Sequence, residues 1–178
     1  MYLESEGLTY DNTRVKISPL VPSIILDYQT RNWKKIQDEK NTTINSVNYL
    51  RIFNEYTLGV LLGIEIGSNI IITNAFGVNF DSDKHLIDDD YVEFMKKYLS
   101  YGTKEKIVGM FHITKNNQDL NDIGVMMAFS QITKKQDAKQ KSIILTTSSE
   151  SLKDTDGSLQ LNAFLYFPFK FGETSSNL

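Results

Sequence analysis

The sequence contains no cysteine, and this absence excludes several kinds of chemistry. Without cysteine the chain has no disulfide bond, no thiol nucleophile and no cysteine-ligated zinc or iron–sulfur site. It also has only two histidines, His85 and His112. A hydrolytic zinc centre needs about three protein ligands and an open position for water. We therefore expect no bound metal and no other cofactor.

Long hydrophobic runs and clusters of basic residues are also missing. No apolar run approaches the roughly 20 residues that a membrane span requires, and the first twelve residues lack the apolar centre of a signal peptide. The net charge is −3, without the clustered Lys and Arg that neutralise phosphates. We expect a cytoplasmic protein that binds neither membrane nor nucleic acid directly.

The chain is long enough for one compact domain with a proper core. It has 178 residues, of which 40% are hydrophobic. The composition predicts a flexible leader at 1–12, a single domain at 13–168 and a flexible tail at 169–178. Residues 33–54, rich in Lys, Asn, Thr and Asp, are expected to form an exposed insertion in that domain.

Hydrophobic periodicity predicts an alternation of strands and helices. Strands are expected at 13–17, 56–66, 69–80, 106–113, 142–146 and 158–167, and helices at 18–31, 88–101 and 119–132. Gly67-Ser68 predicts a hairpin turn between the second and third strands. This order favours an α/β fold with a curved mixed sheet flanked by helices. A Rossmann fold is excluded because no GxGxxG motif opens a helix.

Two glycines interrupt the strand predicted at 56–66. Gly59 and Gly63 would weaken an ordinary strand, so they indicate a bulge or the close approach of another backbone.

The first predicted helix is more apolar than a single core-facing stripe requires. Core packing and a partner interface both explain this surplus. The candidate interface residues on this helix are Leu20, Val21, Ile24, Ile25 and Tyr28. A second candidate set, also expected to face inward, comprises Met126, Met127 and Phe129.

Five ordered sequence blocks carry a family resemblance. They are ISPLVPSIILDYQTRN, LGVLLG, ITNAFGV, IVGMFHIT, and SIILTT followed by GSLQLNAFLYF. In this order and rough spacing they resemble the MPN (Mov34/PAD-1 N-terminal) domain, from about Val15 to Phe167. The resemblance implies an α/β sandwich of the JAB and cytidine-deaminase-like kind.

Active members of that family are zinc isopeptidases, and their motif is incomplete in this sequence. The positions of the motif's glutamate, two histidines and aspartate correspond to Tyr56, His112, Thr114 and Gly124. Only His112 is retained, so the resemblance implies a protein without catalytic activity. The alternative is a zinc-dependent deubiquitinase with displaced ligands, for which Glu55 and Asp122 are the neighbouring carboxylates.

The catalytically inactive, or silent, members that this chain resembles are similar to subunits of three large assemblies. These are translation initiation factor three, the proteasome regulatory lid and the COP9 signalosome. HIT followed by NDIGV favours the lid, whereas the closing strand SLQLNAFLY, which lacks a Pro-Thr-Glu-Ala-Tyr sequence, favours the initiation factor. We therefore expect a subunit of translation initiation factor three that acts in protein synthesis, with the lid or the COP9 signalosome as the alternative. The resemblance implies a scaffold that dimerises with another MPN subunit and contacts PCI-type subunits.

Overall fold

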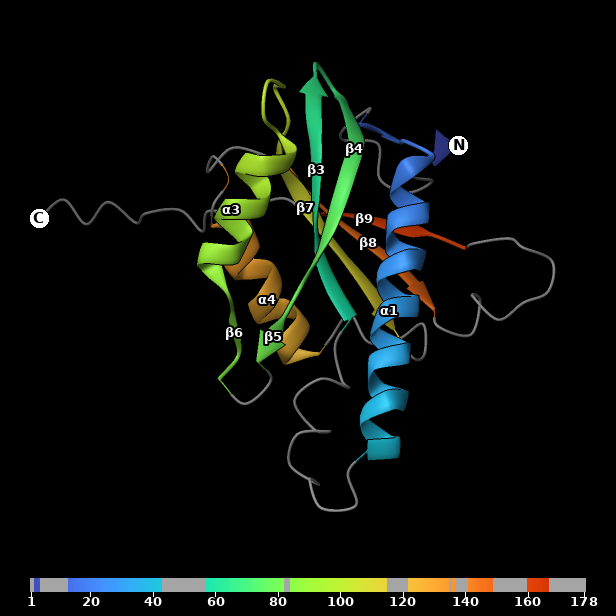
Figure 1. Ribbon diagram of the computed structural model, residues 1–178. Coiled ribbons are helices and arrows are strands. Elements are labelled where there is room, and N and C mark those ends of the chain that lie inside the picture. The colour runs from blue at the N-terminus through green and yellow to red at the C-terminus, as the bar shows by residue number, and fades with distance from the viewer. Residues whose placement is uncertain are drawn as a thin grey trace, which may run out of the picture.

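The computed structural model describes residues 2–3, 13–42, 57–81, 84–114, 122–134, 136, 141–148 and 160–166. Within these ranges a mixed sheet of seven strands carries helices on both faces (Figure 1). The predicted fold class is therefore confirmed.

The strand order in the sheet is β1-β2-β4-β3-β7-β8-β9. The strands are β1 (Tyr2–Leu3), β2 (Arg14–Ile17), β3 (Thr57–Ile66), β4 (Asn69–Val78), β7 (Lys106–Thr114), β8 (Ser142–Ser148) and β9 (Asn162–Tyr166). Parallel pairs join β2 to β4 and β7 to β8, and the other neighbours are antiparallel. The buried strands β3, β4 and β7 form the centre, because their residues are apolar on both faces.

The glycines in β3 and in the turn after it have the structural roles that the sequence predicts. Gly67 has a φ of 60° in the two-residue turn that joins β3 to β4. The β3–β4 register shifts between Leu62 and Gly63, which marks a bulge. At Gly59 a Cβ atom would overlap the ring of Phe111, so the absence of a side chain allows this ring to lie over the strand.

One face of the sheet is covered by helix α1 (Leu20–Thr42). The Ser18 carbonyl accepts from the Val21 N–H at 3.0 Å, and the Ser18 side chain from the Leu20 N–H at 3.4 Å. Proline near this helix start is tolerated because the first-turn N–H groups lack intrahelical partners. The buried side of α1 packs on a cluster that includes Ile72, Phe111 and Leu145.

The other face carries α3 (Asp89–Leu99) and α4 (Ile123–Thr133). Asp88 caps α3 by accepting from the Tyr91 N–H at 3.0 Å. Buried residues of both helices, such as Val92 and Val125, join the core cluster on this face. A small hairpin of β5 (Phe80–Asp81) and β6 (Leu86–Ile87) precedes α3, and the Gln131 side chain bonds to it at His85 and Ile87.

Two features differ from the sequence prediction. The first helix continues to Thr42 and does not end near Arg31, so its last turns enter the segment expected at 33–54. That segment has no Gly or Pro before Thr42 and contains good helix formers, so the helix continues there without apolar periodicity. Within the predicted leader, Tyr2–Leu3 pairs with β2 as a short strand. Residues 43–56 and the predicted tail lie outside the described residues.

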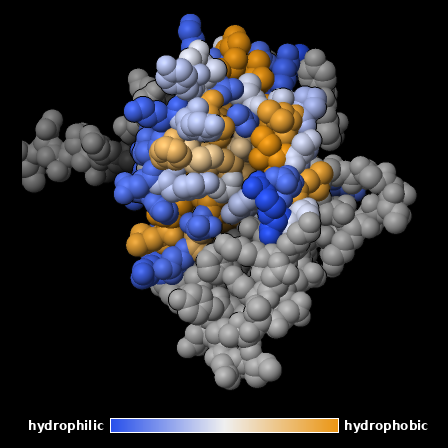
Figure 2. Space-filling model, viewed as in Figure 1, coloured by the Kyte–Doolittle hydropathy of each residue, from blue (hydrophilic) through white to orange (hydrophobic). Residues whose placement is uncertain are grey.

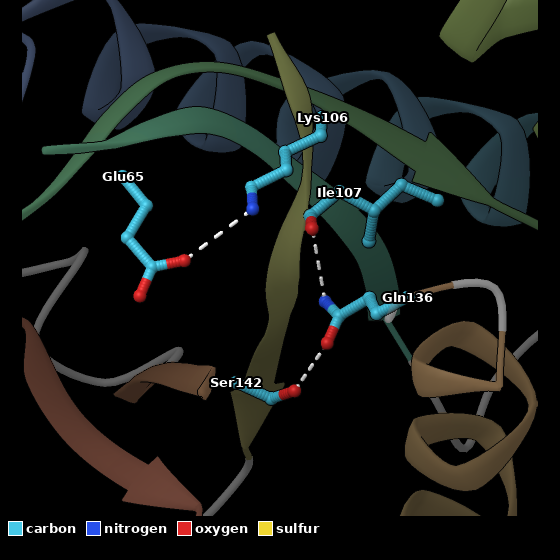
Figure 3. Close-up of polar contacts among 5 residues, drawn as sticks. All are labelled: Glu65, Lys106, Ile107, Gln136 and Ser142. Carbon is cyan, nitrogen blue, oxygen red and sulfur yellow. Dashed lines mark hydrogen bonds and ion pairs between the residues drawn. The ribbon is translucent and has the colours of Figure 1, made fainter. Parts of the chain in front are cut away.

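A polar network joins the end of α4 to the sheet (Figure 3). The Gln136 side chain donates to the Ile107 carbonyl at 3.1 Å and accepts from the Ser142 hydroxyl. The β3–β7 register shifts beside this point, between Leu61 and Leu62. Nearby, Lys106 pairs with Glu65 across the two strands at 3.3 Å.

Candidate functional site

The retained histidine lies near the carboxyl end of β7, on the face of the sheet that α4 covers. Met110, two residues earlier, belongs to the core cluster of α3 and α4, whereas Phe111 and Ile113 belong to the cluster beneath α1. Because side chains alternate along a strand, His112 and Thr114 share the face of Met110. The structure therefore brings these two predicted positions together, and both are buried.

The neighbouring positions on β8 are neutral hydroxyls. Thr146 lies opposite His112 and Ser148 opposite Thr114 in the parallel register, and both are buried. The Thr114 hydroxyl donates to the Thr147 carbonyl at 3.4 Å. Neutral hydroxyl groups are poor substitutes for imidazole or carboxylate in holding zinc.

The third predicted position, Gly124, lies in the first turn of α4 and is buried. The nearby carboxylate of Asp122 caps this helix, accepting from the Gly124 N–H at 2.7 Å and from the Val125 N–H at 3.3 Å. Tyr56 and Glu55 lie outside the described residues.

The chemistry available at this position is limited. In the part of the chain that the structure describes, no three His, Asp, Glu or Cys residues lie close enough to hold a metal ion. The described residues offer one imidazole with hydroxyl groups beside it on β7 and β8, and the Asp122 carboxylate already caps a helix. This set supplies too few ligands for a hydrolytic metal centre.

The candidate interface on α1 is largely a core surface. Val21 and Ile25 are fully buried, and Ile24 and Tyr28 pack against the same cluster. The Tyr28 hydroxyl donates to the Val78 carbonyl at 3.1 Å, and its ring meets Phe111 edge-on at 6.1 Å. Val21 and Ile25 cannot contact a partner while the domain is folded, because the sheet already covers them. Leu20 is 52% exposed.

The second candidate set, on α4, divides between core and surface. Phe129 is buried, and its ring contacts Tyr166 of β9 edge-on at 5.1 Å. Met126 and Met127 are each 42% exposed, so the expectation that they face inward is wrong. Ile123, which the sequence analysis did not select, is exposed beside them along the helix.

The described helices include none that is long and apolar enough to cross a membrane.

Three exposed aromatic side chains lie on α3, a surface that the sequence analysis did not predict. Val92, Met95 and Leu99 face the core, whereas Tyr91, Phe94 and Tyr98 are exposed. Figure 2 shows apolar groups among polar ones where α3 lies in Figure 1. The signal was present in the sequence, because two apolar stripes exceed what one buried face of a helix requires.

Sequence comparisons identify two relatives. The 26S proteasome regulatory subunit rpn-8 of Neurospora crassa is 27% identical over 129 residues, which cover 67% of this chain and 32% of that protein. The 26S proteasome regulatory subunit RPN8 of Saccharomyces cerevisiae is 26% identical over 177 residues, which cover 90% of this chain and 47% of that protein. The chain thus spans less than half the length of either relative. No family model matches the sequence.

Proposed function

We propose that the chain is an MPN-domain protein and a non-catalytic subunit of an assembly of the proteasome regulatory lid kind. In this role it pairs with a second MPN-domain subunit and acts as a rigid scaffold. The observation that carries the proposal is the similarity to two proteins whose names place them in the regulatory part of the 26S proteasome.

The comparisons favour the lid over the initiation factor. Both relatives are named as proteasome subunits, so the similarity of the closing strand, SLQLNAFLY, to the initiation factor is the weaker signal. Short strand motifs of alternating residues recur in many sheets, because any half-buried edge strand selects for that pattern. The similarity to the yeast relative, in contrast, covers 90% of this chain.

The degenerate site supports a role without hydrolysis. In a zinc hydrolase a bound metal activates the water molecule, and a base takes its proton. At the described positions His112 is accompanied by Thr114 and Gly124, which supply neither. The carboxylate of Asp122, at the N-cap of α4, already accepts from two N–H groups of the helix.

The exposed side of α4 supports a role in assembly. Ile123, Met126 and Met127 place three large apolar side chains on the outer surface of a helix whose opposite side is core. Methionine adapts its shape to different partners, and exposed apolar groups of this size mark protein interfaces. We therefore assign this side of α4 to the contact with the second MPN subunit.

Affinity purification of the tagged, full-length protein from the cells that make it tests the proposal. Mass spectrometry of the bound proteins is expected to identify proteasome subunits, including one with an MPN domain. Recovery of ribosomes and initiation factors instead would overturn the lid assignment. Zinc analysis of the same preparation is expected to give far less than one ion per chain, and stoichiometric zinc would contradict a silent site.

A pair of matched variants tests the surface. Met126→Asp introduces a charge on the outer side of α4 and is expected to reduce recovery of the partner about tenfold or more. Ile66→Asp places the same charge on an exposed apolar residue at the end of β3 and is expected to leave recovery unchanged. Equal losses in both variants would exclude α4 as the specific contact. Circular dichroism establishes that each variant is folded.

A further inference from the structure

The outer edge of β9 is unpaired in the described part of the sheet. β9 is the last strand in the sheet order, and its inner edge pairs antiparallel with β8. Alternate residues of an edge strand turn their N–H and C=O groups away from the sheet, where another strand can bond to them. The edge of β9 is therefore a template for one kind of partner, an extended strand.

Strand β9 lacks three features that commonly protect an edge. Its sequence, Asn-Ala-Phe-Leu-Tyr, contains no charged residue and no proline. Its register with β8 is continuous from Ser142 opposite Tyr166 to Thr146 opposite Asn162, so no bulge twists the edge away. Phe164 and Tyr166 are also 44% and 43% exposed. An edge of this composition favours the addition of a strand.

The two faces of β9 differ, and this difference restricts how a second strand can align. Ala163 and Leu165 pack against the core cluster beneath α1. Phe164 and Tyr166 lie on the opposite face, because side chains alternate along a strand, and the Tyr166 ring contacts Phe129 of α4. A partner strand matches both faces if it also has aromatic residues on one face and aliphatic residues on the other.

We propose that β9 pairs with β9 of a second copy of this chain, antiparallel about a two-fold axis at Phe164. In this register Phe164 lies opposite its own copy, and Asn162 lies opposite Tyr166. Ala163 and Leu165 lie opposite each other on the other face. Aromatic and aliphatic residues of the two copies therefore meet their own kind across the strands, which stabilises the pair. The two sheets become one continuous sheet.

The two-fold arrangement is favoured over an open row of copies. The strand at the other end of the sheet, β1, has two residues, whereas β9 has five. Pairing of β9 with β9 therefore forms the longer ladder of hydrogen bonds, and association ends at two copies.

A single short strand sets the strength of this association. The contact is smaller than a standard interface, so the dissociation constant is expected on the order of 100 µM. The contact is a sheet edge and not the outer side of α4, and it does not depend on the proposed function.

The absence of cysteine from the chain allows a crosslinking test of the pairing. In Phe164→Cys the two introduced thiols face each other across the axis, within the distance that a disulfide spans. Under mild oxidation at about 500 µM, we expect roughly half of the chains or more to form a linked dimer. Ile66→Cys is the matched control, because Ile66 is also exposed at a strand, and it is expected to give about a tenth of that yield or less.

A mixture of two further variants tests the direction of the strands. In the antiparallel pair, Asn162→Cys places its two thiols roughly 14 Å apart, and Tyr166→Cys does the same. Each variant alone is therefore expected to form little linked dimer. Mixed in equal amounts, the two variants place unlike thiols opposite each other, and the yield should come within about threefold of that of Phe164→Cys. Parallel strands would instead link each variant to itself, which would overturn the proposal.

The original chain provides the remaining measurement. Sedimentation equilibrium is expected to show monomers and dimers, and the β9 amide hydrogens should exchange more slowly as the concentration rises. Phe164→Lys places two like charges opposite each other and is expected to weaken dimerisation about tenfold or more, whereas Ile66→Lys should not. Circular dichroism establishes that each variant is folded.

Three results would overturn the proposal. The first is a chain that remains monomeric at about 1 mM, well above the expected constant. The second is a linked yield of Ile66→Cys equal to that of Phe164→Cys. The third is exchange of the β9 amides that does not change with concentration, which would leave this edge to a strand of a different protein.

Discussion

The two faces of the sheet are covered by helices of different character. On one face, Val21 and Ile25 of α1 are buried, and the Tyr28 hydroxyl is bonded to β4. On the other, α3 and α4 also bury a core side, but their outer sides carry exposed Phe94 and Met127. The comparison shows that apolar content alone does not identify an interface. The orientation of each apolar residue relative to the sheet decides whether it stabilises the fold or is available to a partner.

Ile25→Ala should produce the largest effect on stability. The side chain is 1% exposed, so its truncation removes buried surface and leaves a cavity. The expected loss in the free energy of unfolding is about 2–5 kcal/mol, measured by denaturant titration. Partner recovery by the fraction that remains folded should be unchanged. A loss below about 1 kcal/mol would show that α1 is not part of the core.

Asp122→Ala should have an intermediate effect, because it removes the cap of α4. The carboxylate accepts from the N–H groups of Gly124 and Val125, and its loss is expected to cost about 1 kcal/mol of stability. Asp27→Ala provides the matched control: its carboxylate forms an exposed ion pair with Arg31 at 2.5 Å. That pair contributes at most a few tenths of a kcal/mol, so equal effects of the two variants would argue against the cap.

Met127→Ala should have the smallest effect on stability. Its side chain is exposed on α4, so we expect the free energy of unfolding to change by less than about 0.5 kcal/mol. If this side of α4 contacts a partner subunit, recovery of that subunit should nevertheless fall. A loss of more than about 2 kcal/mol in the isolated chain would mean that Met127 is a core residue and would remove the contrast between the two faces.

The sequence predicts the sheet better than it predicts the outer surfaces. Two independent signals predict the hairpin of β3 and β4: the strand pattern of apolar residues on both sides, and the Gly67-Ser68 turn between them. The structure pairs these two strands antiparallel. The adjacency of His112 and Thr114 follows from the same period. The family resemblance identified them as site positions.

Local pattern does not determine which stripe of a helix faces the sheet. On α3, Tyr91, Phe94, Met95 and Leu99 all fit a helical spacing, yet Met95 and Leu99 pack on the core and Phe94 is 64% exposed. Docking of Val92 against the sheet sets this rotation, and it depends on residues distant in sequence. The two-residue strands of the β5–β6 hairpin are too short to have a detectable period.

The Gln136 side chain has a mechanical consequence for any partner that binds α4. It forms hydrogen bonds with the Ile107 carbonyl and the Ser142 hydroxyl, so the residue that follows α4 is bonded to the adjacent strands β7 and β8. If a partner tilted α4, either these hydrogen bonds would break or β7 and β8 would move together with the helix. Those strands hold His112 and Thr146, so a displacement of α4 by a partner would also move these two buried residues.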